Sequence, residues 1–133
     1  MATSVAATVT MHLPWAPASV SEARKCLQDW LSEQGGSDES VEDARVVVSE
    51  LVANSVRHAQ PLADGSIIVA WRMVEPWVDL SVTDGGSETE PRNVHAPPSA
   101  PAGRGMAIVE VLAHRWWAEH TPSQSTVHAL LPL

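Results

Sequence analysis

A short segment, Ser49–Ala59, carries three side chains that can do chemistry at four-residue intervals. They are Glu50, Asn54 and His58. The segment is typical of a helix, and helical residues four apart lie one above another on the same face. Carboxylate and amide oxygens suit Mg²⁺ and its waters, and a carboxylate can also accept a proton. This polar column therefore predicts metal or proton chemistry on one helix face.

The opposite side of this helix consists of small and apolar residues. They are Ala44, Val47, Val48, Leu51, Val52, Ser55 and Ala59. The pattern predicts a core helix with a single polar column.

Two turns farther along the chain supply complementary groups. Asp84-Gly85-Gly86 follows a predicted strand, where the carboxylate can accept a hydrogen bond from an amine and glycine lets a flat ring approach the backbone. Gly103-Arg104-Gly105-Met106 precedes a predicted helix, whose first N–H groups form a ready anion site beside an arginine. Each turn alone is more often a plain connector, but their order and their spacing from the polar column strengthen the case for a binding site.

The predicted elements that position these groups come from hydrophobic periodicity and turn residues. A helix begins at Ser19, with Ser19 and Glu22 as a capping box, and ends at Gly35-Gly36. The remaining elements are strands at 5–13, 66–74, 77–83, 116–119 and 125–131, and helices at 37–59 and 106–114. The segment 84–102 is rich in Pro and Gly and has no period, which indicates a functional or disordered loop.

The order of these elements predicts an α+β fold in one domain spanning residues 1–133. Strands and helices do not alternate, so a doubly wound parallel sheet is disfavoured. We expect a two-layer sandwich with a mixed, mainly antiparallel sheet of about five strands and helices on one face.

Composition limits the function classes. The net charge is −8 and the isoelectric point is near 5.0, which argues against direct nucleic-acid binding. The single cysteine, Cys26, lies among helical residues, where a structural role is favoured over a catalytic thiol. The sequence shows neither a signal peptide nor an apolar run long enough to span a bilayer, so we expect a cytoplasmic protein with no membrane partner.

These motifs together resemble the ATP-binding domains of the GHKL type, shared by gyrase, heat-shock chaperone ATPases, histidine kinases and mismatch-repair ATPases. Within that group the chain is most similar to the small anti-sigma-factor serine kinases of bacteria. Ser49–Ala59 resembles their N box, Asp84-Gly85-Gly86 their G1 box, and Gly103–Met106 their G2 box. Ser125-Thr126-Val127 resembles the threonine-bearing strand that closes the adenine pocket.

The resemblance assigns roles to the polar column and to the G1 turn. Asn54 would coordinate the Mg²⁺ that bridges the ATP phosphates, and Glu50 would be the general base. Asp84 would bind the adenine amine, while Gly86 would leave room for the ring. His58 matches the family too, but we interpret it as a packing or hydrogen-bonding residue at the helix end.

The resemblance also implies a phosphate cap, a lid and partners. Gly103, Arg104, Gly105 and Met106 would cap the phosphates, below a lid at about 87–102, and Thr126 would contact the adenine end. The expected activity is that of an ATP-dependent anti-sigma factor and protein serine kinase. Its partners would be an antagonist protein of the STAS-like class and a sigma factor, with a homodimer expected by analogy.

One departure from the family pattern leaves an alternative open. The G1 box often continues to a second glycine, and here that position is Glu88, within the acidic stretch Ser87–Glu90. The alternative is a nucleotide-gated regulatory binding module with weak or no kinase activity.

Overall fold

The computed structural model describes residues 8–86 and 104–133. It contains five strands and three helices: β1 (Val9–Pro14), α1 (Ala18–Glu33), α2 (Asp38–His58), β2 (Ser66–Val74), β3 (Trp77–Asp84), α3 (Arg104–Leu112), β4 (Arg115–His120) and β5 (Ser125–Pro132). This order is the predicted one, and most bounds agree with the prediction to within about two residues. Val5 and its neighbours at the predicted start of the first strand, and most of the predicted loop, lie outside the described residues.

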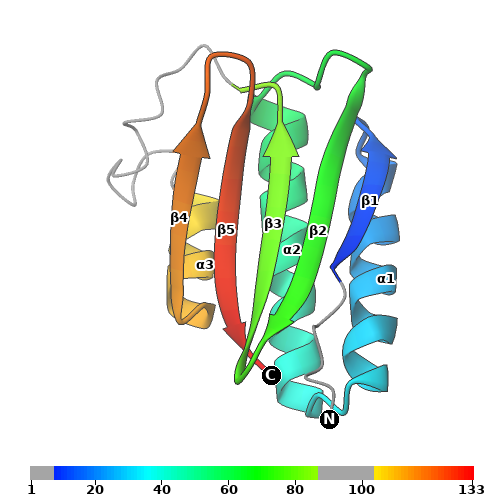
Figure 1. Cartoon of the computed structure of the whole chain (residues 1–133), viewed down its shortest axis with the longest axis vertical. Coiled ribbons are helices and arrows are strands. Elements are labelled where there is room, and N and C mark those ends of the chain that lie inside the picture. Colours follow the sequence, from blue (N-terminus) through cyan, green and yellow to red (C-terminus); the bar gives the residue numbers. More distant parts are fainter. Residues whose placement is uncertain (1–7, 87–103) are drawn as a thin grey trace, which may run out of the picture.

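The strands form one sheet in the order β1-β2-β3-β5-β4, and every pairing in it is antiparallel. The three helices lie together on one face of this sheet (Figure 1). The predicted two-layer α+β class is therefore confirmed. We expected a mixed, mainly antiparallel sheet. All four strand pairs among the described residues are antiparallel.

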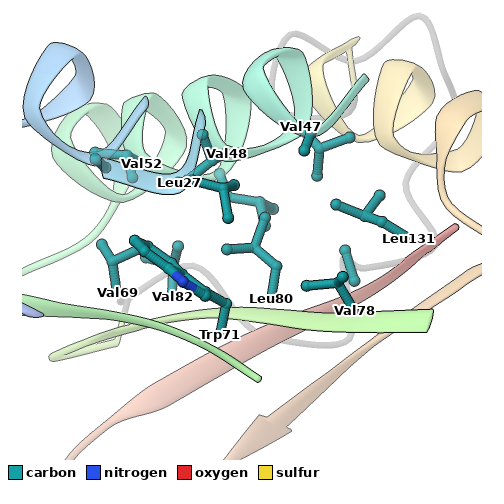
Figure 2. Close-up of a cluster of buried hydrophobic side chains, with 14 of the residues drawn as sticks. Leu27, Val47, Val48, Val52, Val69, Trp71, Val78, Leu80, Val82 and Leu131 are labelled. Carbon is teal, nitrogen blue, oxygen red and sulfur yellow. The ribbon is translucent and has the colours of Figure 1, made fainter. Parts of the chain in front are cut away.

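The core lies between the sheet and the helices, and α2 is its centre. In β2 and β3 buried and less buried residues alternate, because successive strand side chains point to opposite faces. Figure 2 shows side chains of β2, β3 and β5 meeting those of α1 and α2; Trp71 is the largest fully buried one. The predicted apolar face of α2 is buried from Ala44 to Ser55. This burial holds the opposite, polar column of α2 in a fixed orientation.

The start of α1 differs from the prediction. The residue that precedes the helix is Pro17, and no side chain caps its N-terminus. Ser19 lies inside the helix, and its hydroxyl donates to the carbonyl oxygen of Pro14 at 2.6 Å. The predicted capping box of Ser19 and Glu22 is therefore wrong, because the helix already begins at Ala18 and the Ser19 hydroxyl bonds to the end of β1 instead of to a backbone N–H of the helix.

The start of α2 has a true side-chain cap. The Ser37 hydroxyl accepts from the Ser40 backbone N–H at 3.0 Å, and Asp38 and Glu39 lie in the positive first turn. Gly35, with φ of +84°, makes the reversal between α1 and α2 in a conformation that favours glycine.

Replacing Ser37 with alanine should therefore lower the free energy of unfolding by about 1 kcal/mol. The loss arises because the Ser40 N–H no longer has its side-chain acceptor. Urea denaturation of the wild type and the variant measures it. Ser32→Ala, at an exposed position near the end of α1, is the matched control, and an equal effect of both substitutions would contradict the capping role.

Candidate functional site

The polar column of α2 meets the start of α3. Glu50 and Asn54 are half-buried, whereas His58 is exposed at the last turn of the helix. The Asn54 amide nitrogen donates to the Met106 sulfur at 3.6 Å, although the two residues are far apart in sequence. This contact uses the amide nitrogen of Asn54 and does not occupy its amide oxygen, which can accept or coordinate separately. The structure thus brings together two of the predicted site residues.

Glu50 lines a groove between α1 and α2 with a volume of about 210 Å³. The groove is lined by Arg24 of α1 and by Glu42, Arg45, Val46, Ser49 and Glu50 of α2. The Arg45 guanidinium forms an ion pair with Glu42 at 3.0 Å. A carboxylate at the edge of an open groove can accept a proton from a group that enters from solvent.

Asp84 lies at the end of β3, where only 8% of its surface is exposed. The Ser55 hydroxyl donates to its Oδ2 at 2.5 Å, and the Gly86 N–H donates to its Oδ1 at 2.8 Å. Ser55 directly follows Asn54. Helix α2 therefore carries the proposed metal ligand, Asn54, and also holds Asp84, the carboxylate proposed to bind the nucleotide's adenine. Sequence reasoning placed Ser55 among the core residues and missed this contact; the only signal was a hydroxyl on an otherwise apolar face.

Burial raises the pKa of the Asp84 carboxyl, because removal from water penalises the charged form. The hydrogen bonds from Ser55 and Gly86 and the positive charge of His120 oppose this rise. Perturbed carboxyl groups of this kind gather at binding and catalytic sites.

A pair of backbone hydrogen bonds holds the turn after β3 against the segment that follows α2. The Gly85 N–H donates to the Gln60 carbonyl at 2.7 Å, and the Gln60 N–H donates to the Gly86 carbonyl at 2.8 Å. A Cβ atom at Gly85 would lie 2.1 Å from the Pro61 carbonyl oxygen, so this close approach requires glycine. Gly86 has φ of +88°, and no atom of the described residues lies within 4 Å of the place where its Cβ would be. The first glycine thus positions Asp84, and the second leaves room beside it.

Thr126 lies on the other face of the sheet from Asp84. It pairs with Thr83, and the two hydroxyl oxygens are 2.8 Å apart. Its neighbour Ser125 pairs with Asp84, and directly opposed strand residues share a face. The structure therefore does not bring Thr126 to the Asp84 carboxylate. The residue in that position is Ser125, one place earlier, because successive side chains of a strand alternate between faces.

The predicted phosphate cap is described only in part. Arg104 and Gly105 are the first residues of α3, and Met106 contacts Asn54 from its first turn. Gly103, Glu88 and the predicted lid at 87–102 lie outside the described residues.

The raised pKa of Asp84 predicts a pH-dependent stability. Between the ordinary carboxyl value, about 4, and the raised value, the folded chain keeps a proton that the unfolded chain has released. The free energy of unfolding should therefore fall as the pH rises through this window, and Asp84→Asn should remove that fall. Urea denaturation over a pH series measures both.

Asp64→Asn is the control for this experiment. Asp64 is exposed, and hydrogen bonds from Ser66 lower the pKa of its carboxyl. Its contribution to stability is lost as the pH falls, which is the opposite sign. A pH profile of Asp84→Asn that is parallel to that of the wild type would contradict the assignment.

Comparison with known proteins identifies the family of this arrangement. Residues 13–130 match the family described as histidine kinase-like ATPase domain. The serine-protein kinase RsbW of Listeria innocua is 38% identical over 80 residues, which cover 59% of this chain and 51% of the relative. RsbW of Oceanobacillus iheyensis is 29% identical over 116 residues, covering 78% of this chain and 73% of the relative. The chain spans about half the length of the first of these relatives.

Two solved structures share the fold. The RsbU and RsbW domains of Rv1364c from Mycobacterium tuberculosis superpose with a TM-score of 0.74 at 24% identity, over 96% of this chain and 32% of that one. The SiaB-SiaC complex of Pseudomonas aeruginosa gives a TM-score of 0.71 at 12% identity, over 92% of this chain and 88% of that one. None of the helices within residues 8–86 and 104–133 is long and apolar enough to cross a membrane. The predicted family resemblance is confirmed: the chain belongs to the histidine kinase-like ATPase domain family.

Proposed function

We propose that this chain binds ATP with Mg²⁺ along the C-terminal half of α2 and transfers the terminal phosphoryl group to a serine of a protein partner. The observation that carries the proposal is the Ser55–Asp84 hydrogen bond. It joins the helix of Glu50 and Asn54 to the buried carboxylate at the end of β3. The carboxylates of Glu50 and Asp84 and the amide of Asn54 are thereby held in fixed positions relative to one another.

The residues at the Asp84 end fit a nucleotide base. An ionised carboxylate has about four acceptor positions, and Ser55 and Gly86 occupy two of them. The remaining positions can accept an exocyclic amine, and the open space at Gly86 admits a flat ring. Ser125, on the face of Asp84, takes the adenine-end role that we had expected of Thr126.

The residues at the other end fit phosphates and a metal ion. The Asn54 amide oxygen would hold Mg²⁺, and the backbone N–H groups of Arg104, Gly105 and Met106 at the start of α3 would cap the phosphates. The resemblance adds the N–H of Gly103, which precedes this helix in the sequence. Bound ATP would supply the phosphoryl group, and Mg²⁺ would offset its negative charge.

Glu50 is the proposed base, and the groove beside it is the proposed entry for the partner. The carboxylate would accept the proton of the attacking serine hydroxyl. The curated relatives are named as serine-protein kinases, and one related fold was solved as the SiaB-SiaC complex. We propose an anti-sigma antagonist protein as the substrate, a sigma factor as the second partner and a homodimer as the assembly.

Replacing Asn54 with alanine should weaken the binding of ATP in the presence of Mg²⁺ by about tenfold or more, because one metal ligand is lost. The weaker binding of ATP without Mg²⁺ should change little. Calorimetry with and without the metal ion measures both. His58→Ala, on the exposed last turn of α2, is the matched control, and equal losses with and without Mg²⁺ would contradict the metal role.

Replacing Glu50 with glutamine should slow phosphoryl transfer by about 10²- to 10⁴-fold, because a general base of this kind contributes that much. Binding of ATP should be retained. Transfer of labelled phosphate from ATP to the antagonist protein measures the rate. If the wild type binds ATP and transfers no label, the nucleotide-gated binding module replaces the kinase.

A further inference from the structure

The first turn of α3 reaches the proposed metal ligand of α2 through the side chain of Met106. Helix α3 packs beside α2 (Figure 1), and the Asn54 Nδ2 donates to the Met106 Sδ at 3.6 Å. Among the described residues, this is the hydrogen bond that the Asn54 side chain makes. A single sulfur atom thus meets the amide that would bind the metal ion.

The hydrophobic core holds both partners of this contact in place. In the next turn of α3, Val109 is fully buried, and the Met106 side chain itself packs against the core. On α2, the buried residues Val52 and Ser55 come before and after Asn54 in the same stretch of helix. The meeting of sulfur and amide therefore follows from the way the two helices pack.

The chemistry of the two groups decides which end of the amide faces the sulfur. A primary amide donates through its nitrogen and accepts, or coordinates a metal ion, through its oxygen. A thioether sulfur has no proton to donate, so it can pair only with the nitrogen end. With its nitrogen at the sulfur of Met106, Asn54 turns its oxygen away from that residue, where the oxygen stays available to a metal ion.

A competing acceptor lies one turn earlier on α2. Glu50 and Asn54 are four residues apart, and helical side chains at this spacing meet, so that an amide can donate to a carboxylate. Such a pair would turn the Asn54 nitrogen toward Glu50 and occupy the proposed base. No hydrogen bond of this kind joins the two residues in the described structure, where the nitrogen bonds to Met106 instead. The sulfur thus leaves both the Glu50 carboxylate and the Asn54 oxygen free.

We infer that Met106 is a positioning residue whose sulfur orients the Asn54 amide, so that the amide oxygen faces the Mg²⁺ of a bound nucleotide. This inference rests on the proposed nucleotide site. The acting atom belongs to the side chain, whereas the proposed phosphate cap uses the backbone N–H of the same residue. A substitution at Met106 changes the sulfur and keeps the N–H, so the two roles can be separated by experiment.

Three variants isolate the acceptor. Met106→Leu keeps a side chain of similar size and apolar character but has no acceptor atom. Met106→Gln supplies a carbonyl oxygen that can accept from the same amide nitrogen. Met11→Leu is the matched control, because Met11 is also half-buried against the core but lies on β1, at the edge of the sheet away from β4.

The orientation can be measured on the nucleotide-free protein. Nitrogen-15 NMR follows the exchange of the Asn54 side-chain N–H protons with water. We expect this exchange to be several-fold faster in Met106→Leu, because the nitrogen has lost its acceptor, and to keep the wild-type rate in Met106→Gln and Met11→Leu. An exchange rate that Met106→Leu leaves unchanged overturns the inference.

The consequence for the metal ion can be measured by calorimetry with ATP, with and without Mg²⁺. Met106→Leu should weaken the binding of ATP with Mg²⁺ by about threefold to tenfold, the effect of one hydrogen bond, and should change the binding of ATP alone little. Met106→Gln should regain the lost affinity, and a loss equal to that of Met106→Leu would contradict the role of the acceptor.

Two further outcomes separate this inference from the proposed function. Equal losses with and without Mg²⁺ in Met106→Leu mean that the substitution disturbs only the phosphate cap, which overturns the inference and leaves the proposed function intact. A wild type that binds no ATP in the presence of Mg²⁺ overturns the proposed function itself, and the role of Met106 with it.

Discussion

The hydrogen bond from Ser55 to Asp84 is the interaction on which the rest of the site depends. It is buried, it joins a helix to a strand, and one of its partners is an ionisable group. Hydrogen bonds to charged groups contribute more than neutral ones, and an unpaired buried carboxylate would be costly. The core between α2 and the sheet must therefore set the distance between these two residues closely. The same constraint fixes the orientation of the polar column of α2.

The backbone around this bond reinforces it. Two hydrogen bonds between Gln60 and the Gly85-Gly86 turn hold the end of α2 beside the end of β3. The Ser55 carbonyl oxygen also accepts from the indole N–H of Trp15 at 3.1 Å, which ties the segment before α1 to the same point. Three chain segments thus converge on Ser55. A carboxylate held in this way can remain buried and still offer acceptor positions to a ligand.

The sequence predicted the long elements well because their periodicity is a property of many residues. β2 has the predicted bounds, and α2 (Asp38–His58) agrees with the predicted 37–59 to within one residue at each end. Single-residue contacts were less predictable. Ser19 and Ser37 are both serines that precede helical patterns, but Ser19 finds the Pro14 carbonyl oxygen as an acceptor. Likewise, the side chains of neighbouring strand residues point to opposite faces of the sheet. Whether Ser125 or Thr126 lies on the face of Asp84 could therefore be decided only from the pairing of β5 with β3.

The position of Asp84 beside the last turns of α2 also explains which groups face its carboxylate. The C-terminal end of a helix carries a partial negative charge, which adds to the unfavourable field at a buried carboxylate. Groups that offer positive charge or N–H donors are therefore favoured there. The Gly86 N–H from the turn and the Ser55 hydroxyl from the helix are such donors. The amine of a base would add a further donor to this acceptor-rich end. The phosphates require the opposite environment, and the start of α3, where Met106 meets Asn54, provides a helix N-terminus.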